Sequence, residues 1–394
     1  MENVSSSNGL EKRPKLRFPG FDKPWKVFKA EELFQNITDK NHPDETVLTI
    51  IQGKGTLPRE QAGRNIHYDD ASLSNYKKVE QGDFIIHLRS FEGGLEMANE
   101  AGIVSPAYTI LRCKRPHSSL FYDAYFHTDE FINHNLSKSV EGIRDGRQIS
   151  YEAFKWLGIP YCEPTEQEKI SNLFAALNER IAKQRDLIEA LKKYKRGVNN
   201  QILSQIDNSY NCRLGSVCEI VGGGTPDTLH TEYWGNTVEW FTPSEIGKTK
   251  YVNNSVRKLS DIGLDNSSAK LLPIGTVLLT TRATLGEMSI AKQECSTNQG
   301  FQSLIPHTDR VSSEYLYYMQ IIIKPWCEKY ASGNTFREIS KSALSDCIIP
   351  IPDRARQEQI VKLLSSIDLI IGGAESISMS LSKIRHGLMQ QLFI

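Results

Sequence analysis

Two stretches of the chain carry apolar side chains at alternating steps of four and three residues. One series begins at Ile170 and the other at Ile360. A repeat of about 3.5 residues is typical of helices that pack along a coiled-coil seam. The pattern predicts two long helices, within residues 159–208 and 349–394; two amphipathic helices packed separately on globular domains are the alternative. The seam positions expected to pair the helices are Ile170, Phe174, Leu177, Ile181, Ile188, Leu191, Ile360, Leu364, Ile367, Ile371, Leu381 and Leu388.

The segments before these helices, residues 15–158 and 209–348, have a different pattern. Short runs of β-branched and other apolar residues alternate with turn-forming residues. This texture predicts two α/β or α+β domains, each with a substantial sheet and each followed by a long helix. The clearest predicted strands lie within residues 47–51, 83–88, 276–280 and 302–305.

The chain repeats itself with a shift of 190 residues, most clearly where each domain meets its helix. Ile159-Pro160 matches Ile349-Pro350, and Gln167-Glu168 matches Gln357-Glu358. Upstream, Arg147, Ile149, Ser150 and Ala153 match Arg337, Ile339, Ser340 and Ala343. We therefore predict a tandem duplicate. Away from the helices the two copies hardly agree in sequence, which suggests related tasks on different targets.

Composition narrows the class of protein. The 394 residues contain 47 Lys and Arg against 47 Asp and Glu, so the chain is not a lone, strongly basic nucleic-acid binder. No apolar run reaches the roughly 18 residues that span a bilayer, and the N-terminus lacks the apolar core of a secretory signal. We expect a cytoplasmic protein with no membrane partner, whose polar residues 1–14 form a disordered tail.

The sequence predicts neither a catalytic nor a metal site. The seven cysteines form no C-x-x-C pair and are odd in number, which favours buried, reduced thiols. Gly247-Lys248-Thr249 ends like a phosphate-binding loop but lacks the upstream glycine, since position 242 is Thr and 243 is Pro. No H-E-x-x-H or G-x-S-x-G string occurs.

Several strings taken together resemble the specificity (S) subunits of type I restriction–modification systems, over essentially the whole chain. One lies near the N-terminus, from Leu16 to Phe21 with Trp25 following, and another joins the second domain to its helix at Ile349-Pro350-Ile351-Pro352. The first junction lacks the second proline, and the first domain lacks the Arg-Ala-Thr and Asn-Gln-Gly strings. The second domain carries Gly223-Gly224-Thr225-Pro226, Tyr233-Trp234-Gly235, Trp240, Arg282-Ala283-Thr284-x-Gly286 and Asn298-Gln299-Gly300-Phe301.

The resemblance implies a DNA-recognition subunit without a catalytic centre. Target-recognition domains at 15–158 and 209–348 would each read one half of a split site on double-stranded DNA. The two helices would pair as an antiparallel coiled coil with pseudo-two-fold symmetry, which sets the spacing of the half-sites. Two adenine-methyltransferase (M) subunits and motor–nuclease (R) subunits are the implied partners. S-adenosylmethionine would belong to the former and ATP with Mg to the latter, so this chain binds no cofactor itself.

The chemistry of base recognition selects the candidate site residues. Arg or Lys reads guanine in the major groove, Asn or Gln reads adenine, and hydroxyl groups adapt to either. In the second domain Asn298-Gln299-Gly300 is alternatively a turn that satisfies its own backbone, and Thr225-Pro226 the start of a strand. The candidates there are Thr225, Trp240, Thr242, Arg282, Thr284, Asn298 and Gln299.

In the first domain the candidates are cations in or beside loop-like stretches. Most are expected to contact phosphate or solvent, because phosphate contacts outnumber base contacts. They are Arg59, Arg64, Arg89, Arg112, Lys114 and Arg115.

Two other functions compete with DNA recognition. A coiled-coil scaffold whose two globular domains bind proteins would form stable oligomers and show no sequence preference on DNA. A stand-alone enzyme would need a matching set of acids, bases or nucleophiles at the 190-residue offset if the site were duplicated. Isolated matches such as Glu168 with Glu358 occur, but no such set does.

Overall fold

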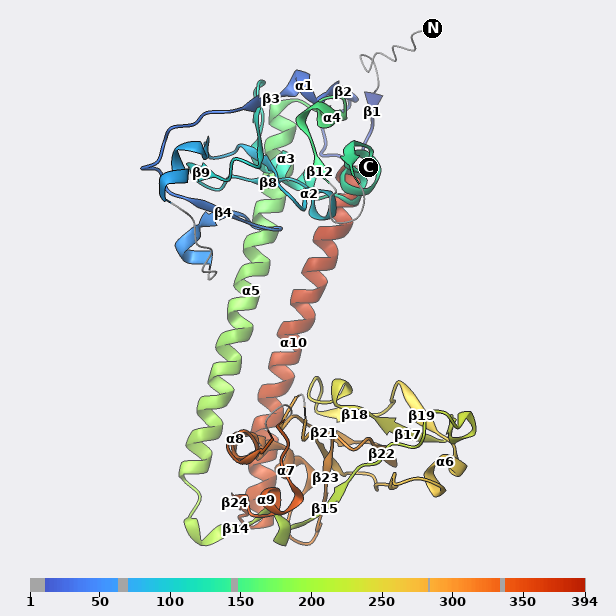
Figure 1. The fold of residues 1–394 in the computed structure, drawn as a ribbon. Coiled ribbons are helices and arrows are strands. Elements are labelled where there is room, and N and C mark those ends of the chain that lie inside the picture. The colour runs from blue at the N-terminus through green and yellow to red at the C-terminus, as the bar shows by residue number, and fades with distance from the viewer. Residues whose placement is uncertain (1–10, 63–69, 143–147, 283, 334–336, 394) are drawn as a thin grey trace. The chain divides into compact units, whose positions relative to one another are not determined.

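The computed structural model describes residues 11–62, 70–142, 148–282, 284–333 and 337–393 (Figure 1). The chain divides into two compact units: residues 1–186 with 375–394, and residues 187–374. Each unit therefore contains one globular domain together with parts of two long helices.

The long helices lie where the 3.5-residue pattern predicts them. Helix α5 spans Pro164–Ser204 and helix α10 spans Arg354–Phe393. Both begin later than predicted, because Ile159-Pro160 and Ile349-Pro350 belong to strands. These strands are β13 (Gly158–Tyr161) and β24 (Ile348–Pro350). Each pairs antiparallel with a strand at the beginning of its own domain, so the repeated Ile-Pro dipeptides complete the domains and the helices follow.

The first unit is built around a four-stranded sheet in the order β3-β10-β7-β8. A separate three-stranded sheet, β1-β2-β13, lies where the domain meets α5. The helices of the domain are α1 (Ala30–Leu33), α2 (Ser90–Gly93), α3 (Ser119–Phe126) and α4 (Tyr151–Phe154). The remaining strands are β1 (Glu11–Lys12), β2 (Trp25–Lys29), β3 (Phe34–Ile37), β4 (Leu48–Ile51), β5 (Gly55–Pro58), β6 (Lys77–Val79), β7 (Phe84–Ile86), β8 (Glu96–Met97), β9 (Gly102–Val104), β10 (Thr109–Cys113), β11 (Val140–Glu141) and β12 (Gln148–Ile149).

The predicted disordered tail, residues 1–14, is too long at its C-terminal end. Glu11 and Lys12 form β1 and pair with Lys26 and Trp25 of β2. Residues 1–10 lie outside the described part of the chain, as does Arg147, one of the residues matched in the repeat.

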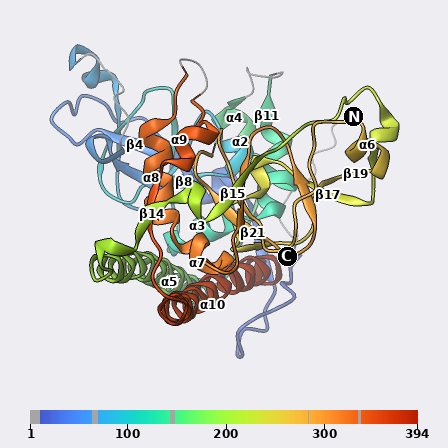
Figure 2. The ribbon, with the colours of Figure 1, turned by 90° about the horizontal axis from the view of Figure 1, so that it is seen from below.

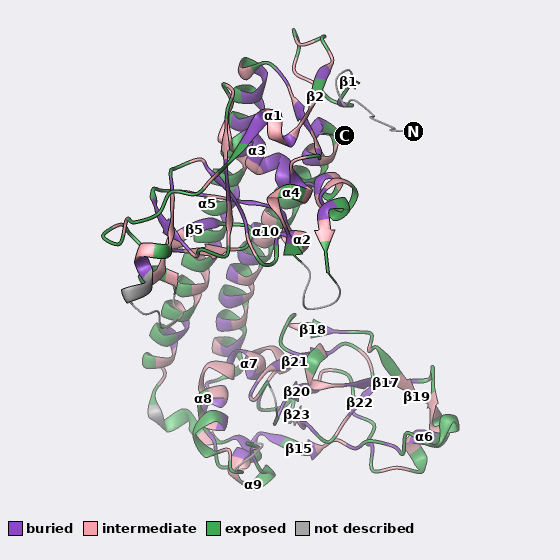
Figure 3. Ribbon diagram, turned by 45° about the horizontal axis from the view of Figure 1, so that its top comes forward, coloured by how far each residue is buried: buried purple, intermediate pink, exposed green. Residues whose placement is uncertain are grey.

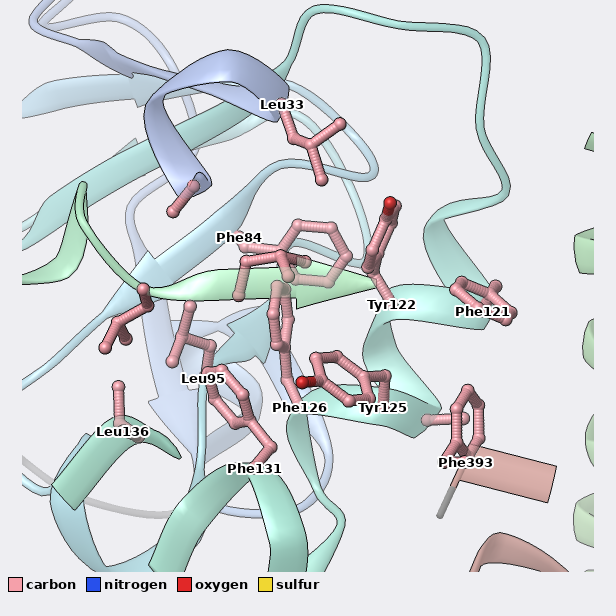
Figure 4. Close-up of a cluster of buried hydrophobic side chains, with 14 of the residues drawn as sticks. Leu33, Phe84, Leu95, Phe121, Tyr122, Tyr125, Phe126, Phe131, Leu136 and Phe393 are labelled. Atoms are coloured by element: carbon pink, nitrogen blue, oxygen red, sulfur yellow. The ribbon is translucent and has the colours of Figure 1, made fainter. Parts of the chain in front are cut away.

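An aromatic cluster forms the core of the first unit (Figure 4). The Phe84 and Phe126 rings meet edge to face with centroids 5.0 Å apart, and Phe126 and Phe131 lie at 4.7 Å. Phe393, the last residue of α10, inserts its ring 5.2 Å from Phe121. It also stacks on Phe174 of α5, at 6.1 Å. The first part of α5 and the last part of α10 therefore pack together within this unit.

The second unit contains a five-stranded sheet in the order β15-β23-β20-β21-β18 and a four-stranded sheet in the order β16-β19-β17-β22. Helices α7, α8 and α9 lie on the side nearest α10, and β17, β19 and α6 lie farther from it (Figures 1 and 2). The strands are β14 (Asn211–Arg213), β15 (Cys218–Gly222), β16 (Trp234–Gly235), β17 (Val238–Phe241), β18 (Tyr251–Val252), β19 (Arg257–Leu259), β20 (Val277–Leu279), β21 (Met288–Ala291), β22 (Cys295–Thr297) and β23 (Gln302–Pro306). The helices are α6 (Asp261–Asp265), α7 (Ser313–Tyr318), α8 (Gln320–Tyr330) and α9 (Lys341–Ser345).

The last part of α5 packs against the first part of α10 within the second unit. Ile202 shares a core with Ile360, Leu364 and the strands of the domain. Lys195 also forms an ion pair with Asp368 of α10. Buried residues alternate with exposed ones along both helices (Figure 3). Of the predicted seam positions, Leu177, Leu191, Leu381 and Leu388 are half-buried, and the others are buried.

The described residues show neither a membrane-spanning helix nor a cluster of metal ligands. None of their helices combines the length and apolar character needed to cross a membrane. They also contain no group of three or more His, Cys, Asp or Glu side chains arranged to hold a metal ion.

Candidate nucleic-acid interface

Three loops of the second unit meet at one edge of its sheets. They follow β15, connect β20 to β21, and connect β22 to β23. The Thr281 amide donates to the Gly300 carbonyl at 2.8 Å, and the Gly224 amide to the Thr297 carbonyl at 2.8 Å. These bonds fix the loops to one another, so that side chains distant in sequence share one surface.

Thr225 and Gln299 are brought together at this surface. The Thr225 hydroxyl donates to the side-chain oxygen of Gln299, and both residues are exposed. The glycines before Thr225 allow the loops this close: a Cβ on Gly223 would lie 2.0 Å from the Asn298 carbonyl oxygen. The Gly-Gly-Thr-Pro string is thus explained by close backbone approach. It presents a hydroxyl and an amide, two groups that read base edges.

Arg282 lies on the exposed loop between β20 and β21. Its guanidinium forms an ion pair with Glu338 at 2.8 Å, and its side chain remains 44% exposed. The Thr281 hydroxyl donates to the same carboxylate at 3.4 Å. On the same loop Thr284 is exposed and donates to the Pro243 carbonyl at 3.4 Å. Glu338 therefore positions the Arg282 side chain, which remains accessible.

Sequence reasoning missed Glu338. It lies far along the chain from Arg282 and outside the strings that carry the family resemblance, so no local signal pairs the two residues. Only the fold brings this carboxylate to the loop.

Trp240 is not an accessible reading residue, contrary to the prediction. Its indole is 3% exposed and donates to the Gly224 carbonyl at 3.0 Å. It also packs edge to face against Trp234, with centroids 5.1 Å apart. The large aromatic side chain of Trp240 is buried on β17, where its hydrogen bond holds the 223–225 loop in place.

Two further candidates form turns. The Thr242 amide and hydroxyl both donate to the Glu245 carboxylate, at 2.8 and 2.7 Å, in a capping box at the short turn Pro243–Glu245. The Asn298 side-chain oxygen accepts the Gly300 amide at 2.9 Å, as in the alternative of a turn that satisfies its own backbone. Both are half-buried at the edge of the surface, where they shape the loops that carry Thr225, Arg282 and Gln299.

In the first unit, Arg112 is committed to an internal ion pair. Its guanidinium makes two bonds to the buried Asp83 carboxylate, at 2.8 and 2.7 Å, and a contact to Glu80 at 3.1 Å. The hydrogen bond to Asp83 raises the pKa of Arg112. Because Asp83 precedes β7 and Arg112 lies on β10, the pair braces the central sheet. The prediction that Arg112 contacts DNA is therefore not supported.

Arg115 also has partners in its own domain. Its guanidinium stacks 4.0 Å from the centroid of the Phe28 ring. It lines a cavity of about 680 Å³ that also contains Arg17, Trp25 and Glu166 at the beginning of α5. This position near the junction of domain and helix gives Arg115 a packing role.

The other first-domain candidates differ in accessibility. Lys114 is exposed and donates to the Glu31 carbonyl. Arg59 is half-buried, and its Nε donates to the Thr49 hydroxyl at 3.4 Å. Arg64 lies outside the described residues. Arg89 is exposed, and its side chain makes no hydrogen bond or ion pair within the described part of the chain.

A buried cluster of ionisable side chains in the first unit supports the hairpin of β4 and β5. Glu96 is buried and accepts the backbone amides of Gly53 and Gly55, at 2.6 and 2.9 Å, between β4 and β5. His127 faces Glu96 at 3.3 Å. Burial lowers the pKa of His127, but the hydrogen bond to Glu96 and the neighbouring Asp123 outweigh burial and raise it to about 9. These groups are internally paired, as expected of a structural network.

The thiols provide no activated nucleophile. The cysteines are free, with Cys113 and Cys212 half-buried and the others buried. Burial raises the pKa of Cys218, Cys295 and Cys347 to about 12. Thiols shifted in this direction stay protonated and are poor nucleophiles at neutral pH.

Comparisons with known proteins match the segment that carries this loop surface to a known family. Residues 207–376 match the family described as "Type I restriction modification DNA specificity domain". The chain is 34% identical over 186 residues to the type I restriction enzyme MjaIX specificity subunit of Methanocaldococcus jannaschii, covering 46% of this chain and 43% of that protein. It is 24% identical over 259 residues to the EcoR124I/EcoR124II specificity subunit of Escherichia coli, covering 61% and 62%. These alignments span less than two thirds of each relative.

Solved structures share the fold across nearly the whole chain. One belongs to work described as "Structural basis underlying complex assembly and conformational transition of the type I R-M system", with a TM-score of 0.59, 20% identity, and coverage of 96% of this chain and 99% of that one. The type I restriction–modification S subunit from M. genitalium has a TM-score of 0.54 and 15% identity, with coverage of 97% and 99%. At these identities the likeness shows the fold.

The fold is a mixed α/β architecture with long helices, and residues 207–376 match the family of DNA specificity domains. The chain is similar to specificity subunits of type I restriction–modification systems.

Proposed function

We propose that this chain is the DNA sequence-recognition subunit of a type I restriction–modification complex and has no catalytic centre of its own. The observation that carries the proposal is the loop surface of Thr225, Arg282, Thr284 and Gln299. It lies inside the segment that matches the DNA specificity domain. Exposed guanidinium, amide and hydroxyl groups on fixed loops are the chemistry of base-edge readout.

Each domain reads one half of a bipartite site on double-stranded DNA, and the two domains are copies of one scaffold. Similar contacts on the strand before each long helix support the duplication: the Tyr122 hydroxyl donates to the Pro160 carbonyl, and the Tyr315 hydroxyl to the Pro350 carbonyl. The domains correspond to residues 15–158 and 209–348, with spacer segments at 159–208 and 349–394.

The two helices pair as an antiparallel coiled coil and set the distance between the half-sites. Support comes from each unit separately, because the beginning of α5 packs on the end of α10 in the first. In the second, the end of α5 packs on the beginning of α10. A pseudo-two-fold protein then matches a site with two halves, as dimeric DNA readers do.

Two adenine-methyltransferase subunits dock on the helices and domains, and motor–nuclease subunits join the full complex in the cytoplasm. S-adenosylmethionine is bound by the former and ATP with Mg by the latter. Exposed apolar side chains along α10 support helix docking, because such residues in a soluble protein mark contact surfaces. They are Leu363, Leu369, Ile370, Ile377, Met379 and Ile384.

The balanced charge agrees with a shared DNA interface. Phosphate neutralisation dominates the affinity of DNA-binding proteins, and a chain with 47 positive and 47 negative side chains contributes little net attraction. The isolated subunit is therefore expected to bind DNA weakly, and the partners supply much of the phosphate contact.

Adenine methylation of host DNA, sequenced with the gene intact and with it deleted, tests this function. A bipartite motif with methylated adenine in each half should disappear on deletion. Replacing residues 209–348 by another such domain should change one half of the motif only. If no motif depends on the gene while the partner subunits are expressed, the chain does not direct DNA recognition in that host.

A further inference from the structure

The central strands of the two domains correspond to each other with a constant shift of 193 residues. The sheets run β3-β10-β7-β8 in the first unit and β15-β23-β20-β21 in the second. Phe84 of β7 pairs with Leu111 and Met97. Val277 of β20 pairs with Leu304 and Ile290, each 193 residues further along the chain.

Backbone hydrogen bonds confirm the same register at the beginning of these strands. The Gly82 amide donates to the Ala98 carbonyl at 2.9 Å, and the Gly275 amide to the Ala291 carbonyl at 2.9 Å. Both glycines adopt a positive φ, 90° and 86°. The return bonds also match: Ala98 donates to Asp83, and Ala291 to Thr276. The loops that follow β7 and β20 are therefore equivalent, although their sequences differ.

Arg89 and Arg282 hold the same position on these equivalent loops. Each lies three residues after its strand, which ends at Ile86 or Leu279. Both are exposed. Among the first-domain candidates within the described residues, only Arg89 combines exposure with a side chain that makes no hydrogen bond or ion pair within the domain. The fold therefore singles out one arginine per domain.

We propose that Arg89 and Arg282 are corresponding specificity-determining residues, each of which reads a guanine in its own half-site. This inference rests on the proposed function. A guanidinium donates two parallel hydrogen bonds to guanine O6 and N7. Glu338, 2.8 Å from Arg282, disfavours a phosphate at that place because two anions would share one cation. A neutral base edge brings no such repulsion.

The register also predicts a property of the target. Each half of the recognition motif contains a G·C pair at the position facing its arginine. A half-site composed of A·T pairs alone would overturn the assignment for that half.

Conservative substitutions of Arg89 and Arg282 test the proposal in the full chain. Each variant is expressed with its partner subunits in the host, and genome-wide adenine methylation is the readout. Arg282→Lys keeps the charge but loses the two-pronged geometry. It should reduce discrimination at one guanine of the second half by about 10- to 100-fold and leave the first half unchanged. Arg89→Lys should do the same in the first half only. Arg13→Lys and Arg213→Lys, at exposed arginines away from these loops, should leave both halves unchanged.

Glutamine substitutions provide a second readout that does not depend on loss of activity. Arg89→Gln and Arg282→Gln should shift the preference at the affected position from guanine towards adenine. The inference is wrong if the Lys and Gln variants keep the wild-type motif. It is also wrong if they lower methylation equally at all sites while thermal unfolding is unchanged, which indicates a phosphate contact. Failure of the proposed function looks different, because the wild type itself then gives no gene-dependent motif.

Discussion

Gln167 and Gln357 make the same hydrogen bonds at the beginnings of the two long helices. The Gln167 amide group donates to the Cys162 carbonyl, and that of Gln357 to the Pro352 carbonyl, both at 2.9 Å. Each side-chain oxygen accepts a backbone amide at the beginning of a domain helix, from Ser118 at 2.9 Å or from Ser312 at 3.2 Å. Each glutamine thus joins a long helix to its own domain, which gives a physical reason for its recurrence in the repeat.

Replacing either glutamine by alanine should destabilise the unit that contains it. Gln167 and Gln357 are 0% and 1% exposed, so the substitutions leave buried amide and carbonyl groups unpaired. We expect a loss of about 1–3 kcal/mol for each variant. Denaturant unfolding followed by tryptophan fluorescence measures the loss. Gln359→Ala, at an exposed position on α10, is the matched control and should change stability by less than about 0.5 kcal/mol. Equal stability of all three variants would refute the bracing role.

The stability of the first unit should fall as the pH rises from about 6.5 to 9. His127 has a folded-state pKa of about 9 against an unfolded value near 6.5, so its contribution is fully present below the unfolded value and is lost as pH passes the folded one. The expected loss is on the order of 1–3 kcal/mol. The groups around this imidazole are Glu96, Asp123 and His87, and burial lowers the pKa of His87.

Buried thiols also lower the free energy of unfolding above pH 8, because they ionise only when the chain unfolds. The measurement is therefore the difference between wild type and His127→Gln in unfolding free energy at several pH values. That difference should shrink as the pH rises through 9. The exposed His386→Gln, also in the first unit, should follow the wild type throughout. Parallel curves for wild type and His127→Gln would rule out this linkage.

Glu338→Gln should weaken discrimination in the second half-site without unfolding the domain. The ion pair with Arg282 is partly exposed, and such pairs contribute about 0–1 kcal/mol to stability. Without the carboxylate, Arg282 is no longer held or shielded from phosphate. Binding of the full complex to cognate and altered DNA should show a smaller preference and a steeper dependence on salt. An unchanged preference would mean that Glu338 does not position Arg282.

The helices and main strands follow from local patterns, since each depends on periodicity within one segment. The 3.5-residue spacing located α5 and α10, and β-branched runs located β4, β7, β20 and β23. The start of each helix was less predictable, because the repeated Ile159-Pro160 and Ile349-Pro350 precede the helical pattern and proline suits the first turn of a helix. Pairing with distant strands makes them part of a sheet instead.

The candidate site was predicted less well, because it depends on long-range partners. Arg89 follows β7 and Arg112 lies on β10, but their sequence contexts do not separate them. What separates them is Asp83, whose carboxylate holds Arg112. The burial of Trp240 likewise depends on Trp234 and on the Gly224 carbonyl, and the position of Arg282 on Glu338. Motif resemblance identified the loops, whereas the fold decides which side chains on them remain accessible.

The glycine pair Gly372-Gly373 lies inside α10, which continues through it without a break. Both residues are exposed, and a Cβ added to either would have no neighbour within 4 Å outside the helix's own backbone. Gly372→Ala and Gly373→Ala should each stabilise the chain by about 0.5–1 kcal/mol, because alanine loses less backbone entropy in a helix. Gly223→Ala is the opposite control, since its Cβ would lie 2.0 Å from the Asn298 carbonyl oxygen and should destabilise the second unit. Denaturant unfolding of the three variants decides the matter. If the α10 substitutions lower the free energy of unfolding instead, the expectation from backbone entropy is wrong for this helix.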